Sequence, residues 1–227
     1  MKPHFLLAAT LALATPAAAT TVTLDFDGDI CTNLASGACF NGASIDQDYG
    51  DIAGQVDVIY DADRGTAALQ PLFYWSTGYE DLTGIAYGVN GGGGLSITLD
   101  AMAGYEISLQ SFDIAPYLNR SRNTLVQVID IEDGGVVFNQ DYTPLSTSGA
   151  TSLTFSGSQF TSAFGLQINL GPDAWDVGID NIVFSVTEID DTPGTPDPSV
   201  IPLPASAVLL LGALGGLSVL RRRNTQA

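Results

Sequence analysis

Between residues 20 and 187 the chain consists of short runs in which apolar and polar residues alternate, and no other feature constrains its fold as strongly. Alternation with a period of two puts successive side chains on opposite faces of a β-strand. Helical periodicity is absent from this region over any useful length. The pattern therefore predicts strands at residues 21–26, 95–100, 106–114, 125–131, 136–139, 152–155, 164–170 and 179–186.

Glycine-rich turn signals separate these runs, for example at residues 90–94, 133–135 and 171–172. Many short strands with turns at this spacing predict an all-β fold, most simply an antiparallel β-sandwich of the jelly-roll type. The consecutive glycines at 91–94 are not followed by a Lys-Ser or Lys-Thr pair. They therefore predict a hairpin or loop rather than a phosphate-binding loop.

Residues 1–19 have the layout of a secretory signal peptide. Lys2 supplies the positive charge, residues 5–14 the apolar core, and residues 17–19 a small-residue cleavage sequence. A permanent N-terminal membrane helix is the alternative, but the short apolar region and Pro16 disfavour it. We therefore expect the chain to be exported.

A second apolar segment, residues 205–220, contains no charged residue, and three arginines follow it directly. As a helix the segment is about 24 Å long, slightly short of a hydrocarbon core of about 30 Å, and snorkelling arginines make up the difference. The segment is predicted as a single transmembrane helix. By the positive-inside rule, residues 221–227 form a basic cytoplasmic tail.

This topology divides the chain into functional segments. Residues 20–187 form one β-sandwich ectodomain, a length that supports a single hydrophobic core. Residues 188–204 are rich in proline, aspartate and threonine, which predicts an extended, solvated linker.

The end of the chain resembles a known sorting signal. A Pro-Leu-Pro-Ala sequence, a short glycine-containing apolar helix and an arginine cluster resemble the PEP-CTERM tail of bacterial surface proteins in its VPLPA-CTERM variant, with Ile201 in place of the usual valine. The residues that carry the resemblance are Pro202, Leu203, Pro204, Ala205, Arg221, Arg222 and Arg223. The resemblance implies an exosortase in the inner membrane that removes the tail, and delivery to the cell surface or extracellular matrix. The alternative is a plain membrane anchor that is never processed.

Charge excludes one class of partner. All 25 acidic residues lie between the two apolar ends, where the only basic residues are Arg64, Arg120 and Arg122. Three positive and 25 negative charges give this portion a net charge of −22. Such a body repels nucleic acid and anionic membrane surfaces, so we expect no DNA or RNA binding.

The same portion contains no lysine and no histidine, because the single histidine is His4 in the predicted signal peptide. A Ser-His-Asp triad, a Cys-His nucleophile, an imidazole-bound zinc ion and a lysine Schiff base are thereby excluded from it. A pair of carboxylates acting on a polysaccharide is the enzymatic route that remains, and no spacing singles out such a pair. We therefore predict a non-enzymatic protein with no catalytic residues.

The two cysteines, Cys31 and Cys39, are close in sequence, and export would place them in an oxidising compartment. A disulfide bond is therefore predicted. Metal binding is the alternative, but the other two ligands of a closed zinc site are missing.

Several segments of the ectodomain resemble jelly-roll ectodomains attached to PEP-CTERM tails, which are similar in shape to galactose-binding-like and carbohydrate-binding modules. The segments are residues 45–51, 56–58, 104–109, 111–113 and 175–182. In such modules a structural calcium ion often ties the first strand to the last. The acidic first strand, with Asp25, Asp27 and Asp29, and Asp180 of the last strand offer candidate oxygen ligands, and the resemblance suggests Asp25, Asp27 and Asp180 as the calcium ligands. The alternative is that Asp180 caps backbone groups while Asp25 and Asp27 are solvated.

Carbohydrate recognition needs exposed aromatic rings beside hydrogen-bonding groups. Aromatic residues gather at 73–75, with Tyr79, and at 117. Trp75, Tyr117 and Arg120 are the predicted ligand-binding residues. The alternatives are that the aromatic rings pack in the core and that Arg120 and Arg122 form local salt bridges.

Three functional classes follow from these observations. The first is an exported surface or matrix protein that binds extracellular polysaccharide. A purely structural matrix component without a discrete ligand is the second, and an enzyme that acts on polysaccharide through carboxylates is the third.

Overall fold

The computed structural model describes residues 19–32, 38–90, 93–145 and 148–189. The predicted transmembrane helix, the basic tail, the sorting signature and nearly all of the predicted signal peptide lie outside these ranges. Within the described ranges no helix is long and apolar enough to cross a membrane. The description that follows therefore concerns the predicted ectodomain.

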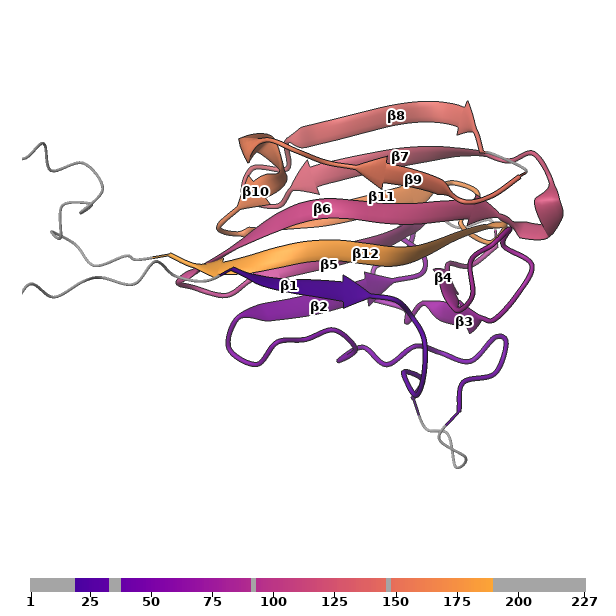
Figure 1. Ribbon diagram of the computed structural model, residues 1–227, viewed down its shortest axis with the longest axis horizontal. Helices are drawn as coiled ribbons and strands as arrows, with labels where there is room; N and C mark the ends of the chain where they lie inside the picture. The colour runs from indigo at the N-terminus through magenta and orange to yellow at the C-terminus, as the bar shows by residue number, and fades with distance from the viewer. Residues whose placement is uncertain (1–18, 33–37, 91–92, 146–147, 190–227) are drawn as a thin grey trace, which may run out of the picture. The chain divides into compact units, whose positions relative to one another are not determined.

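The described part of the chain forms two antiparallel β-sheets, which Figure 1 shows as two layers. The larger sheet contains β1 (Thr20–Leu24), β3 (Phe73–Trp75), β4 (Ile85–Tyr87), β6 (Tyr105–Pro116), β9 (Thr151–Thr154), β10 (Thr161–Ser162) and β12 (Val177–Glu188). The smaller sheet contains β2 (Val56–Asp61), β5 (Leu95–Ala101), β7 (Asn123–Asp130), β8 (Val136–Pro144) and β11 (Gly165–Gly171). Two short 3₁₀ turns, η1 (Tyr117–Asn119) and η2 (Ser158–Phe160), complete the elements.

Strands β6 and β12 form the centre of the larger sheet and pair with each other. β9 and β10 pair with the other edge of β6, while β1 and β4 pair with the other edge of β12. β3 continues the sheet beyond β4. In the smaller sheet the order is β2, β5, β11, β7 and β8. The first and the last strand of the chain are thus direct neighbours (Figure 1).

The core lies between the sheets and follows from the alternation in the strands. In β5, Leu95, Ile97 and Leu99 are fully buried, and in β12 Ile182 and Phe184 are buried in the same way. Burial of this apolar surface, at about 25 cal/mol per Å², is the main force that holds the two sheets together.

The prediction of an all-β fold built from antiparallel sheets is confirmed. Each of the eight predicted runs corresponds to an observed strand, namely β1, β5, β6, β7, β8, β9, β11 and β12. Four further strands, β2, β3, β4 and β10, were not predicted. β3 and β4 have three residues each and β10 has two, so they are too short to display a period of two.

Candidate functional site

Five aromatic side chains line a hollow at one end of the larger sheet: Trp75, Tyr79, Tyr87, Tyr117 and Trp175. Trp75 and Tyr87 end the paired strands β3 and β4, and Tyr79 lies in the loop between them. Tyr117 begins η1 directly after β6, and Trp175 lies in the loop between β11 and β12. The hollow contains about 220 Å³ of empty space, part of which is open to solvent. Two predicted ligand-binding residues, Trp75 and Tyr117, are therefore neighbours in space.

Hydrogen bonds between the three loops fix the positions of the rings. The Tyr79 hydroxyl donates to the backbone carbonyl of Trp175 at 3.0 Å. The Tyr117 N–H donates to the carbonyl of Asp176 at 2.8 Å, and the Leu118 N–H donates to the carbonyl of Gly78 at 2.7 Å. Because each bond joins two different loops, the hollow is held by backbone contacts as well as by ring packing.

Gly78 is needed for this close approach. Its φ of +90° lies in the left-handed region, and a Cβ atom there would lie 2.9 Å from the Tyr117 ring. Three non-glycine residues of the same loops, Glu80, Leu118 and Asn119, also have positive φ values. Left-handed backbone at ordinary residues costs free energy and tends to collect at functional sites.

The rings form a floor and a rim. Tyr79 and Tyr87 are only 3% and 4% exposed and form the floor, whereas Trp175 is 42% exposed. Trp75 and Tyr117 are half-buried. Two pairs of neighbouring rings stand nearly perpendicular: the angle is 82° between Trp75 and Tyr117 and 87° between Tyr87 and Trp175, with centroids 5.7 and 5.4 Å apart. The rings of Tyr79 and Tyr117 are inclined by 40°. Edge-to-face contacts of this kind stabilise the arrangement beyond the burial of area.

Charged side chains lie beside the hollow. Arg122 forms ion pairs with Asp173 and Asp176, which flank Trp175 in sequence. Burial is the main cause that raises the pKa of Tyr79, and the nearby Tyr87 and the carboxylate of Asp176 add to the effect. The Tyr79 hydroxyl therefore stays neutral at physiological pH. The alternative prediction for Arg122, a local salt-bridge partner, is confirmed.

Arg120 does not line the hollow, although it follows Tyr117 closely in sequence. Its side chain is exposed, and its backbone N–H donates to the carbonyl of Tyr117 at the end of η1. The structure thus separates Arg120 from Trp75 and Tyr117. Three lining residues, Tyr79, Tyr87 and Trp175, were absent from the predicted ligand-binding set. Trp175 lies in one of the segments that carry the family resemblance, which was the one available signal.

A second cluster surrounds Asp180 in β12. Asp180 is 3% exposed, and its carboxylate accepts the N–H of Asn181 at 2.7 Å. Burial is the main cause that raises the pKa of Asp180 to about 8, with further contributions from the charges of Asp27, Asp113 and Asp25. The Asn181 side chain donates to Asp113 at 3.0 Å. The structure therefore brings the three predicted calcium ligands close enough to interact.

The three predicted calcium ligands differ in their surroundings. Asp25 and Asp27 are exposed on the chain that follows β1, while Asp180 is buried and favours its neutral form. Among the described residues, no group of three histidine, cysteine, aspartate or glutamate side chains is arranged to hold a metal ion. The backbone contact of Asp180 agrees with the alternative, in which this residue caps a backbone group. Calcium binding stays a prediction.

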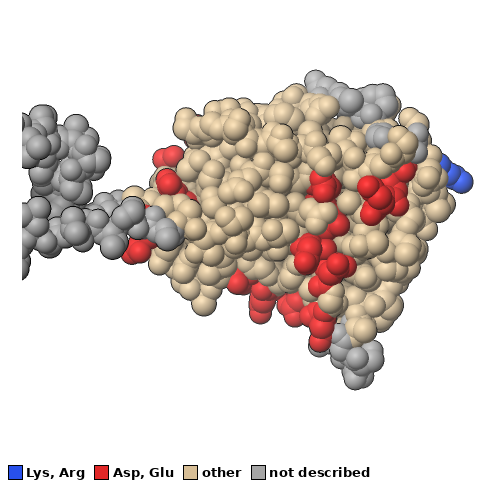
Figure 2. Space-filling view, viewed as in Figure 1, with Lys and Arg blue, Asp and Glu red and all other residues tan. Residues whose placement is uncertain are grey.

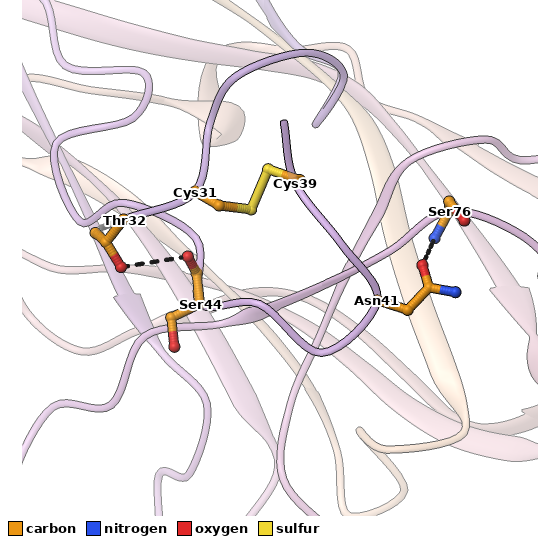
Figure 3. The surroundings of a disulfide bond; sticks show 6 residues. All are labelled: Cys31, Thr32, Cys39, Asn41, Ser44 and Ser76. Atoms are coloured by element: carbon orange, nitrogen blue, oxygen red, sulfur yellow. Dashed lines mark hydrogen bonds between the residues drawn. A yellow bond between two sulfur atoms is a disulfide. The ribbon is translucent and has the colours of Figure 1, made fainter. Parts of the chain in front are cut away.

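The predicted disulfide bond between Cys31 and Cys39 is present, with Cα atoms 5.5 Å apart (Figure 3). Hydrogen bonds tie the neighbouring chain to the body. The Thr32 hydroxyl donates to the carbonyl of Ser44 at 3.4 Å, and the Ser76 N–H donates to the side chain of Asn41 at 2.8 Å (Figure 3). Ser76 directly follows Trp75, so this loop is connected to the chain that carries the hollow.

Figure 2 shows acidic side chains mainly on the right-hand and lower parts of the face that bears β1, β6 and β12, with others near the left end. Most of the remaining surface in this view carries no charged residue.

No protein-family model matches the chain, and the search of curated proteins gave no significant match either.

Proposed function

We propose that this chain is an exported, non-enzymatic cell-surface or extracellular-matrix protein that binds an extracellular polysaccharide through the aromatic hollow. The observation that carries the proposal is the convergence of five aromatic residues, from strands β3 and β4, the turn η1 and two loops, on one partly open hollow. The exposed ring of Trp175 and the half-buried ring of Trp75 offer the apolar faces on which a sugar ring stacks.

We further propose that the sandwich is a jelly roll of the galactose-binding-like type. The antiparallel pairing throughout both sheets and the position of β1 beside β12 support this topology. Export, anchoring in the inner membrane and sorting by an exosortase belong to the same proposal and depend on the sequence signals at the two ends of the chain. The disulfide bond is in keeping with export, because such bonds persist in oxidising compartments.

An enzyme that uses carboxylates is the weaker candidate. Asp180 has the raised pKa that a general acid needs, and ionisable carboxylates surround it. A general acid also has to reach the substrate, however, and Asp180 is 3% exposed. It does not line the aromatic hollow. A structural matrix component without a ligand is the other candidate, and a binding experiment separates it from the proposal.

The test is the binding of the purified protein to polysaccharide from the matrix of its native cells. We expect Trp75→Ala and Trp175→Ala each to weaken binding at least about tenfold, which corresponds to about 1.4 kcal/mol. Phe164→Ala is the matched control, because Phe164 is 51% exposed and lies outside the hollow. If all three variants bind the polysaccharide as tightly as the unmodified protein, the polysaccharide binds outside the hollow. No binding by the unmodified protein would favour a purely structural role.

A further inference from the structure

The lining of the hollow is unusual for a site that recognises a neutral sugar. All five lining residues are aromatic, and their polar atoms are limited to three tyrosine hydroxyls and two indole N–H groups. The Tyr79 hydroxyl already donates to the carbonyl of Trp175. Sugar hydroxyls require several convergent hydrogen-bonding groups, whereas this lining offers mainly π faces. The face of an aromatic ring carries partial negative charge and attracts cations.

The shape of the hollow also favours a compact group. Tyr79 and Tyr87 close the floor, and Trp75, Tyr117 and Trp175 form walls that stand nearly perpendicular to neighbouring rings. Such walls contact a roughly spherical group on several sides at once. A sugar ring, in contrast, stacks on one face at a time.

The charged side chains beside the hollow carry a net negative charge, which attracts cations. Asp173 and Asp176 share one guanidinium, that of Arg122, so this group of three side chains carries one net negative charge. Only three basic residues occur in the chain between the two apolar ends. The strongly acidic body raises the local concentration of cations and repels anions.

We propose that the aromatic hollow binds a quaternary ammonium group by cation–π contacts with these rings. The inference rests on the proposed function, because it names the substituent by which the polysaccharide is recognised. The same chemistry occurs in a free quaternary ammonium solute, and the experiment separates the two sources.

Tryptophan fluorescence reports directly on this site, because the two tryptophans of the chain, Trp75 and Trp175, both line the hollow. The full-length protein is titrated at constant ionic strength with choline and with its neutral isostere 3,3-dimethylbutan-1-ol. We expect a saturable change with choline and affinity at least about tenfold weaker for the isostere, since only the positive charge differs. Equal affinity for the two compounds, or no response to choline, would overturn the inference.

A variant then locates the contact. Tyr117→Leu keeps an apolar side chain but removes a π face, so we expect choline affinity to fall at least about fivefold. Phe164→Leu makes the same kind of change outside the hollow and is expected to leave choline affinity unaltered. The comparison of choline with its isostere uses the unmodified protein. It therefore tests the inference even if a variant fails to fold.

Polysaccharide binding distinguishes this inference from the proposed function. If choline displaces matrix polysaccharide from the protein, the recognised group belongs to the polysaccharide. Binding of choline without displacement would point to a free solute as the ligand and would contradict the polysaccharide as its source. If polysaccharide binds while choline does not, the inference fails and the proposed function stands. If neither binds, both fail.

Discussion

Asp180 is the residue whose ionisation the fold opposes most clearly. It is 3% exposed and surrounded by the charges of Asp27, Asp113 and Asp25, and its pKa is raised to about 8. Between about pH 4 and pH 8 the folded protein holds a proton on this group that the unfolded chain has released. Unfolding then releases the proton, so a rise in pH over this window lowers the stability. The loss from this group amounts to about 1.4 kcal/mol per pH unit.

We therefore expect Asp180→Asn to flatten the decline of the melting temperature between pH 5 and pH 7.5, measured by calorimetry. The asparagine side-chain oxygen can still accept the Asn181 N–H, so the backbone contact is kept. Asp29→Asn is the control, because Asp29 is exposed and its replacement removes one charge without changing a buried group. A pH dependence that is identical in Asp180→Asn and the unmodified protein would contradict a neutral Asp180.

At the same scale, sequence reasoning found the site only in part. Trp75 was visible because it belongs to an aromatic run, and Tyr117 was predicted as well. Tyr87 and Trp175 were missed because each is a single aromatic residue in an otherwise ordinary strand or loop. Their shared position depends on hydrogen bonds between loops far apart in sequence, such as the bond from Tyr79 to Trp175. Local patterns do not contain that information.

Strands were more predictable than the site because alternation is a local property. In β5 and β12 the alternation coincides with burial between the sheets. β2 also alternates and was overlooked, while the short strands β3 and β4 exist only because β12 supplies a partner for β4. The whole fold decides which strands pair, so the sequence of a three-residue segment does not predict that it forms a strand.

The loop closed by Cys31 and Cys39 gives a prediction at the scale of an element. A disulfide that closes so short a loop stabilises the protein by about 2 to 3 kcal/mol through the lost entropy of the unfolded chain. Replacing both cysteines with serine should therefore lower the melting temperature by about 5 to 10 °C. Thermal unfolding monitored by circular dichroism measures the change.

Thr32→Val is the matched control for the disulfide, because it removes a hydrogen bond of 3.4 Å to Ser44 from the same loop and keeps the bulk of the side chain. We expect it to lower the melting temperature by clearly less than the loss of the disulfide. Comparable effects from the two changes would mean that this hydrogen bond stabilises the loop as much as the covalent bond does.

At the scale of the whole molecule, the acidic surface and the aromatic hollow suit an exported protein that meets its ligand in water. The body is separated from the predicted transmembrane helix by the linker of residues 188–204, which contains proline, aspartate and threonine but no basic residue. Removal of the tail would release the body from the membrane altogether.

The sorting proposal predicts the mass and the location of the mature protein. In cells that contain an exosortase, we expect a species that lacks residues 1–19 and the segment after the signature Pro202, Leu203, Pro204 and Ala205, and we expect it at the surface or in the medium. Intact-mass spectrometry of fractionated native cells measures both properties. Deletion of the exosortase should leave the tail attached and the protein in the inner membrane, because residues 205–220 are apolar and Arg221, Arg222 and Arg223 hold the C-terminus in the cytoplasm. A full tail in the membrane of both strains would mean a simple anchored ectodomain, and the proposed sorting would be wrong.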